Sequence, residues 1–299
     1  MDGWLILDKP VGLGSTSAVS AVKRALREGG YAKRKVGHGG TLDPLASGVL
    51  PIAIGEATKL AGRLLDGDKI YEFTISFGVE TDTLDLEGKV IATSDGRPSR
   101  AEVEKVLPRF TGPIAQVPPA FSALKVDGHR AYDLARAGAD VVLASRNVAI
   151  HALTIVDSTE KSVTLTAHVS KGTYIRSLAR DIARAVNTVG HVTMLRRVKA
   201  GPFTLESAIS LDNLGEYGKA RDLEQHLLPL RAGLDDIPAL SLTPDQAGLL
   251  RQGRVLAGIA ADDGSKLAML DDVPVALVEV LDREVRVVRG FNLYDVEGS

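Results

Sequence analysis

Two distant segments of this chain alternate apolar and polar residues, and this alternation limits its fold more than any other feature. From Lys69 to Gly78 and from Val163 to Val169, every second side chain is apolar or aromatic. Successive side chains of a strand point to opposite faces, so both segments are predicted to be strands with one buried face. Strand and helix patterns follow one another without regular alternation, which favours an α+β fold over a doubly wound parallel sheet.

Shorter patterns predict further elements in the first half of the chain. Residues 3–8 are predicted to form a buried strand. Ser17 is predicted to cap a helix that ends at Gly29 and Gly30. The basic, glycine-rich stretch 31–40 is expected to be a loop. Ser99 and Glu102 have the spacing of a capping box for a short helix that ends before a proline.

A second helix is predicted over residues 175–186, where apolar residues recur at helical spacing. On another side of this helix, Arg176, Arg180 and Arg184 recur every fourth residue and form a basic stripe. A break near residues 235–238 divides the chain into a domain of residues 1–237 and a small module of residues 238–299. For this module the sequence predicts a helix capped by Thr243, with Pro244 in its first turn, and strands at 275–281 and 285–291.

The composition excludes several kinds of site. The 299 residues include no cysteine, which excludes disulfides, thiolate nucleophiles and thiolate metal sites. The six histidines show no pair at metal-ligand spacing, so no metal is expected. The glycines at 12 and 14 lack dinucleotide or Walker spacing, so no cofactor is expected either. The absence of cysteine also fits a cytoplasmic protein. The apolar run at the N-terminus is too short for a signal peptide or a membrane span.

Charge is distributed unevenly, although the net charge is only −2. Residues 161–200 contain eight lysines and arginines and one acid, and therefore carry +7. Residues 205–240 contain three basic and seven acidic residues, and therefore carry −4. A protein that binds a polyanion on one face needs such segregation. Solvated helix faces would give the same pattern, and charge alone does not separate the two interpretations.

One aspartate has an unusual setting. Residues 36–51 read VGHGGTLDPLASGVLP, with Asp43 in the middle. Pro44 restricts the backbone of Asp43, and the surrounding glycines permit close approach by a ligand. Aspartates are anions at neutral pH, so this carboxylate needs no base to activate it as a nucleophile. An Asp-Pro pair that merely starts a turn is the alternative interpretation.

This segment and five others resemble the TruB family of tRNA pseudouridine synthases. The string GHGGTLDPLASGVLPIAIGEATK is similar to the pattern G-H-x-G-T-L-D-P-x-A-x-G-x-L of that family. Further similar blocks are LDKP (7–10), TDTLDLEG (81–88), QVPPAFSALK (116–125), GTYIRSLARD (172–181) and LRR (195–197). Two extra residues lengthen the loop after Lys9-Pro10, and Phe121 replaces a tyrosine that many members have. The resemblance implies a mixed, mainly antiparallel sheet flanked by helices, followed by a PUA-like β-rich RNA-binding domain.

The resemblance also implies roles for individual residues. Asp43 is expected to be the nucleophile, paired with Arg176, while Tyr71 stacks on the target base. Leu195 is expected to line the pocket, and His38 to occupy the space that the flipped base leaves. Contacts to RNA phosphates and to the substrate are expected from Lys9, Lys33, Arg34, Lys35, Arg180, Arg184, Arg196, Arg197 and Lys199. From the residues alone, Tyr71 and Leu195 could equally be core residues, and Arg176 a surface ion pair or phosphate contact.

The implied function is the isomerisation of uridine 55 in the T-loop of tRNA. The base would be flipped out, cleaved from its sugar with the help of an aspartate, and reattached through carbon. The partner is then the T-stem-loop of tRNA, with no guide RNA, no membrane and no cofactor, and the protein is expected to be a monomer. Two alternatives are an RNA-folding protein without catalysis and a guide-dependent synthase. Intact Asp43, Tyr71 and Arg176 favour an enzyme, and the absence of a basic extension before the first strand favours one that acts alone.

Overall fold

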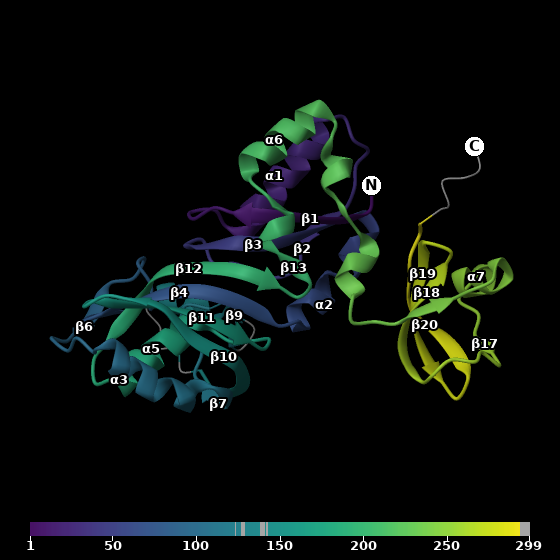
Figure 1. Cartoon of the computed structure of the whole chain (residues 1–299). Helices are drawn as coiled ribbons and strands as arrows, with labels where there is room; N and C mark the ends of the chain where they lie inside the picture. Colours follow the sequence, from purple (N-terminus) through teal and green to yellow (C-terminus); the bar gives the residue numbers. More distant parts are fainter. Residues whose placement is uncertain (123, 127–128, 138–140, 142, 294–299) are drawn as a thin grey trace.

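The structure is a computed structural model that describes residues 1–122, 124–126, 129–137, 141 and 143–293. Ala123, part of the block at 116–125, and the last six residues of the predicted C-terminal module lie outside the described residues. Figure 1 shows a large curved sheet with helices at both ends and a smaller, separate sheet formed by the C-terminal part. Among the described residues, no helix has both the length and the apolar character needed to span a membrane.

The large sheet contains eleven strands in the described part of the chain. They are β1 (Gly3–Lys9), β2 (Val36–His38), β3 (Ala46–Ile54), β4 (Lys69–Phe77), β7 (Gly112–Gln116), β10 (Arg146–Ser158), β11 (Ser162–Val169), β12 (Gly190–Ala200), β13 (Phe203–Thr204), β14 (Ala208–Ile209) and β15 (Leu228–Pro229). The main order is β14-β1-β3-β12-β4-β11-β10-β7, while β2, β13 and β15 pair at the side. Among these described strands only β1–β14 and β3–β12 are parallel pairs, so the expected mixed, mainly antiparallel sheet is confirmed.

Short elements connect and cover this sheet. The α-helices are α1 (Ser15–Glu28), α2 (Ala61–Asp66), α3 (Arg100–Val106), α4 (Ala131–Arg136), α5 (Ile175–Ala185) and α6 (Leu211–Ala220). Single turns of 3-10 helix are η1 (Gly55–Lys59), η2 (Leu107–Phe110), η3 (Leu205–Ser207), η4 (Leu223–His226) and η5 (Leu230–Leu234). Two small hairpins pair β5 (Val79–Thr81) with β6 (Val90–Thr93) and β8 (Lys125–Val126) with β9 (His129–Arg130).

Helices cover the sheet in two groups, and each group closes a separate apolar core. Helix α1 packs with β1, β3 and α6 in one cluster, whereas α5 and α3 pack with β4, β10 and β11 in another. Tyr71 of β4 and Leu195 of β12 contact both clusters. These two side chains therefore mark the junction between the two helical covers.

Both alternating segments form the predicted strands. In β4 and β11 the register joins Phe73 to Leu165 and Ile75 to Val163, so the apolar side chains of both strands share one buried face. The capping box of Ser99 and Glu102 is present at the start of α3. Helix α5 and the end of α1 at Gly29 also agree with the sequence predictions.

Two sequence predictions for the N-terminal region are wrong. Helix α1 begins at Ser15, two residues before the predicted cap, and the side chain of Ser17 makes no cap hydrogen bond. The N-cap is Gly14, whose backbone is extended, and the first helical residue, Ser15, uses its side chain to hold a neighbouring loop. Residues 31–40 are not wholly a loop, because β2 pairs with β3 from Val36 to His38. Three residues are too few to show an alternating pattern.

The C-terminal part forms its own five-stranded sheet and is β-rich, as expected. Its strands are β16 (Ala239–Ser241), β17 (Leu256–Ala257), β18 (Gly264–Leu270), β19 (Val273–Leu281) and β20 (Glu284–Gly290). Helix α7 (Pro244–Arg251) carries the predicted Thr243 cap, completed by Gln246. Leu267 and Phe291 join a core cluster with Trp4 of the large sheet, so the two sheets share apolar contacts. The domain boundary after residue 237 stays a prediction.

Candidate functional site

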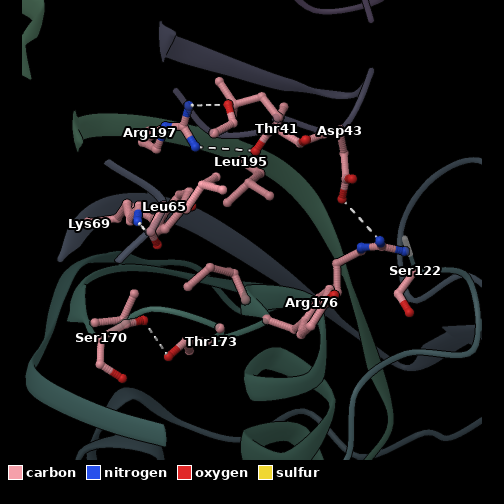
Figure 2. Close-up of a pocket in the computed structure, with 18 of the residues that line it drawn as sticks. Thr41, Asp43, Leu65, Lys69, Ser122, Ser170, Thr173, Arg176, Leu195 and Arg197 are labelled. Carbon is pink, nitrogen blue, oxygen red and sulfur yellow. Dashed lines mark hydrogen bonds and ion pairs between the residues drawn. The ribbon is translucent and has the colours of Figure 1, made fainter. Parts of the chain in front are cut away.

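A pocket of about 340 Å³ opens at the junction of the two helical covers. Tyr71 and Leu195 form part of its wall, together with Val169 at the end of β11 and Ile175 at the start of α5. Polar groups from distant segments meet there, as Figure 2 shows for Asp43, Arg176 and Arg197. A mostly apolar hollow with a few convergent polar groups is the usual form of a small-molecule site.

Asp43 and Arg176, which the family resemblance pairs, meet in this pocket. Asp43 Oδ2 lies 3.0 Å from Arg176 Nη2. The Arg176 side chain is only 8% exposed, whereas that of Asp43 is 43% exposed. The cation is thus fixed in the protein, while the carboxylate stays open to a molecule that enters the pocket. Figure 2 shows the two side chains pointing toward each other.

Arg176 is held by further acceptors on two other segments. Its Nη1 donates to the carbonyl of Thr83 at 2.8 Å and its Nη2 to the carbonyl of Phe121 at 2.9 Å. Asp85 lies 3.5 Å from Nη1 and is itself largely buried. Gln116 holds the start of α5 through hydrogen bonds to the backbone N–H and carbonyl of Tyr174. The planar guanidinium can serve all these oxygens at once because its five donors point in fixed directions.

The loop that carries Asp43 is fixed by three side chains from three different elements. Ser15 of α1 both donates to the carbonyl and accepts from the N–H of Leu42. Arg197 of β12 donates to the carbonyls of Gly40 and Thr41, each at 3.2 Å. Lys9 of β1 donates to the carbonyl of Pro44 at 3.3 Å. The position of the carboxylate is therefore set by side chains that are far apart in the sequence.

Lys9 and Arg197 have a different role from the one the sequence suggests. Direct contacts to the substrate were expected of both, but Lys9 is 0% and Arg197 1% exposed. The ammonium of Lys9 donates to three backbone carbonyls, those of Pro10, Leu13 and Pro44. The guanidinium of Arg197 also donates to three backbone carbonyls, those of Gly40, Thr41 and Val49. Buried cations that donate to backbone carbonyls hold a loop in place. Arg197 also lines the pocket, and whether either side chain contacts the substrate stays a prediction.

Burial of Lys9 predicts a pH dependence of stability. Burial lowers the pKa of its ammonium to about 8, against 10.5 normally, although Asp43 acts in the opposite direction. Between these values the unfolded chain holds a proton that the folded chain has lost, so the Lys9 contribution to the free energy of unfolding rises with pH. We expect Lys9→Met to flatten this rise, measured by urea unfolding at several pH values from 8 to 10.5. The exposed Lys105→Met serves as control, and equal slopes in wild type and Lys9→Met would contradict the prediction.

His38 lies near this site but outside the pocket wall. It is the last residue of β2 and pairs with Ile52 of β3, and the residues that line the pocket do not include it. Burial, and then the charge of Arg197, lower its pKa. Its Nδ1 is buried and has no hydrogen-bond partner among the described residues. Both effects favour the neutral imidazole, and the expected role of His38 in filling vacated space stays a prediction.

The cations expected to grip phosphates fall into two groups. Lys35 lies with Lys33, Arg34, Lys23 and Arg27 around a second, larger hollow of about 920 Å³. These five side chains line it together with Leu26, Tyr31, Ala32 and Val36.

Arg180, Arg184 and Arg196 already have acidic partners. Arg184 pairs with the buried Glu80 at 2.7 Å, and Arg180 pairs with the neighbouring Asp181 at 2.8 Å. Arg196 forms a two-pronged pair with Asp8, at 3.0 and 2.8 Å. Whether these guanidiniums also reach RNA stays a prediction. The stripe is not a single exposed face, because Arg176 points into the pocket while Arg184 is 57% exposed.

Sequence reasoning gave no role to several residues of the pocket. Lys69 lines it and donates to the carbonyls of Leu64, Leu65 and Gly67. Arg146 also lines it, with its guanidinium 4.8 Å from the centre of the Tyr174 ring. Neither residue stands in a recognisable motif. Asp85 could have been found, because it belongs to the TDTLDLEG block.

Comparison with known proteins assigns most of the chain to described families. Residues 27–175 match the model of the TruB family pseudouridylate synthase N-terminal domain. Residues 176–235 match the model of the tRNA pseudouridylate synthase B C-terminal domain. The tRNA pseudouridine synthase B of Novosphingobium aromaticivorans is 64% identical, with 99% of both chains covered. That of Zymomonas mobilis is 61% identical, over 98% of this chain and 96% of the other.

A solved structure shares the fold at lower identity. The chain superimposes with a TM-score of 0.74 on one from the structure of an H/ACA RNP bound to a substrate RNA containing 2′-deoxyuridine. The match covers 97% of this chain and 84% of that one, at 24% identity. The likeness concerns the backbone of both parts of the molecule, the large sheet and the C-terminal β-rich part.

Proposed function

Because this chain belongs to the TruB family of pseudouridine synthases, we propose that it isomerises uridine 55 in the T-loop of tRNA, with Asp43 as nucleophile. The chain is a tRNA pseudouridine synthase, an isomerase. The observation that carries the residue assignment is the open carboxylate of Asp43, 3.0 Å from a buried guanidinium at the wall of the pocket.

The reaction requires two bond changes at the sugar and no net change in composition. The bond from C1′ to N1 of the base breaks, the base turns, and a bond from C1′ to C5 forms. The proton that leaves C5 is balanced by one that N1 gains. The carboxylate of Asp43 can promote this by adding to the base at C6 or to the sugar at C1′. Neither route needs a redox group or an external energy source.

Asp43 is suited to nucleophilic attack because its partner is preorganised. Arg176 reaches the site already bound to the carbonyls of Thr83 and Phe121, so it can hold the carboxylate of Asp43 in place without reorganising, both before the attack and when the carboxylate leaves again as an anion. Tyr71 and Leu195 supply a partly apolar wall on which a base can lie. Such walls also keep water from a sugar that has lost its base.

Access to the pocket requires the uridine to leave its stack. Extrusion of a base costs a few kcal/mol, which contacts in the pocket and to the backbone must offset. A pocket of about 340 Å³ can take one nucleoside but no duplex. We therefore propose that the enzyme binds the folded T-stem-loop and flips one base into the site.

The direct test uses the full chain and an unmodified tRNA transcript, without any other RNA. We expect pseudouridine at position 55 only, mapped by carbodiimide modification and reverse transcription. A transcript with cytidine at that position should yield no product. Pseudouridine at another position would refute the assignment of the target, and no product without added RNA would refute action without a guide. We further propose that the enzyme is cytoplasmic and acts as a monomer. Light scattering of the protein without RNA measures its mass in solution and so tests the oligomeric state.

The basic hollow beside α1 gives a prediction about RNA affinity. Lys33, Arg34 and Lys35 are exposed and converge with two cations of α1, so we propose that they contact tRNA phosphates. Replacing all three by alanine should weaken the binding of different tRNAs by a similar factor. It should also reduce the slope of log K against log salt by about 0.9 for each phosphate that the variant no longer neutralises. Filter binding at several salt concentrations measures this slope. Lys105→Ala with Arg109→Ala on the α3 side is the control, and an unchanged slope in the triple variant would contradict the proposal.

A further inference from the structure

Three potential metal ligands meet on the sheet away from the pocket. Asp68 Oδ2 lies 3.2 Å from His151 Nε2 and 3.5 Å from His168 Nε2. The two imidazole rings lie 4.8 Å apart, centre to centre. Asp68 precedes β4, while the histidines belong to β10 and β11, which are neighbours in the sheet (Figure 1). Spacing along the sequence could not reveal this group, because its members come from three segments.

An irregularity in β10 brings the two histidines together. Ile150 pairs with Val169 of β11, but the next pair joins Ala152 to His168, so β10 has one extra residue there, a β-bulge. Both His151 and Ala152 are exposed, whereas Ile150 and Leu153 on either side are buried. The bulge thus lets Ile150 and Leu153, before and after it, both point into the core. His151, between them, points outward beside His168. Bulges often re-aim a side chain in this way.

We propose that Asp68, His151 and His168 bind a divalent transition-metal ion of the zinc type. Zinc takes histidine nitrogens at about 2.0–2.1 Å and carboxylate oxygens at about 2.0–2.2 Å in tetrahedral geometry, which places neighbouring ligand atoms roughly 3.4 Å apart. The two distances to Asp68 already match this spacing. All three ligand atoms lie within 4.8 Å of one another, so small ring rotations complete the set.

The ligand types select the class of ion. Imidazole nitrogen suits zinc, copper and nickel, whereas magnesium and calcium prefer oxygen ligands alone. The three side chains are 40–48% exposed, so the ion has access from solvent and water can fill a fourth position. The alternative is a site without metal, in which the carboxylate simply accepts hydrogen bonds from the two rings.

The site is separate from the pocket and would act on stability. On β4, Lys69 and Tyr71 line the pocket, while Ile70, the partner of His168, is on the opposite face. A bound ion would join the segment before β4 to β10 and β11. That segment is also held by the Lys171–Asp66 ion pair and by Lys69, so the ion would brace the rim of the pocket without contacting the substrate.

Zinc titration of the full chain, without a histidine tag, tests the proposal. Calorimetry is done near pH 7.5, because protons compete with metal ions for histidine ligands at acidic pH. We expect saturable binding of about one ion per chain, accompanied by a rise in Tm. The double variant His151→Ala with His168→Ala should weaken zinc binding by more than roughly 100-fold. That factor is the upper range of the loss when a residue that only hydrogen-bonds to a metal ligand is replaced. Asp68→Asn should weaken it as well.

Matched controls keep the test decisive. His129→Ala removes a histidine on β9, and Asp157→Asn removes an exposed carboxylate on β10, the strand of His151. Both should bind zinc as wild type does. Circular dichroism verifies that each variant is folded, and cobalt titration should give the visible absorption of a tetrahedral ion only when the three ligands are intact. No saturable binding by wild type, or equal binding by the double variant, would overturn the proposal.

Discussion

Asp43→Asn is expected to eliminate pseudouridine formation while tRNA binding stays close to that of wild type. Asparagine keeps the shape of the side chain but removes the negative charge, and a neutral amide is a poor nucleophile. Loss of a nucleophile typically costs about 10⁴-fold or more in kcat. Affinity should persist because phosphate contacts supply most of it. Tritium released from C5 of labelled uridine under single-turnover conditions measures the reaction, and filter binding measures affinity.

The structure indicates why this variant should remain folded. Asp43 is 43% exposed, and Arg176 keeps Asp85 and two carbonyls as partners when the carboxylate of Asp43 is replaced. Asp43→Ala is the companion variant, because alanine also removes the amide that could still contact the substrate or Arg176. Product formation by the alanine variant at a rate near that of wild type would show that another group attacks the uridine.

The elements around the site were largely predictable because their signals are local. Alternation defines β4 and β11, and apolar spacing defines α5, whose first turn holds Arg176. The resemblance in sequence then joined Asp43 to Arg176, which periodicity could not do across more than a hundred residues. The short strand β2 escaped prediction, since three residues show no period.

Side-chain roles that depend on long-range packing could not be predicted. A lysine in a Lys-Pro motif and an arginine in a basic segment both suggest contacts to RNA. In the structure, Lys9 and Arg197 instead saturate carbonyls of the loop that carries Asp43. Burial decides between the two roles, and burial follows from how β1, β3 and β12 come together. The cluster of Asp68, His151 and His168 could not be predicted either, because its geometry depends on strand pairing and on a bulge in β10.

Arg176 combines two functions that substitution can separate. It faces the open carboxylate of Asp43 on one side and the buried carboxylate of Asp85 on the other. Arg176→Met should lower kcat by about 10²–10³-fold, the typical cost of removing one preorganised electrostatic group. It should also lower the free energy of unfolding by about 3–5 kcal/mol, because Asp85 is left buried without its partner. Arg176→Lys should rescue little, since an ammonium cannot serve both carboxylates and two carbonyls.

The double variant Arg176→Met with Asp85→Asn distinguishes catalysis from folding. Removing the buried charge of Asp85 should restore much of the stability, because the penalty arises from an unpaired carboxylate and not from the absence of the ion pair itself. Activity should stay low, since the carboxylate of Asp43 then lacks its cationic partner. Urea unfolding and single-turnover kinetics on the four proteins of this cycle measure both quantities. Recovery of activity together with stability would mean that Arg176 only supports the fold, and that the carboxylate of Asp43 acts without a cationic partner.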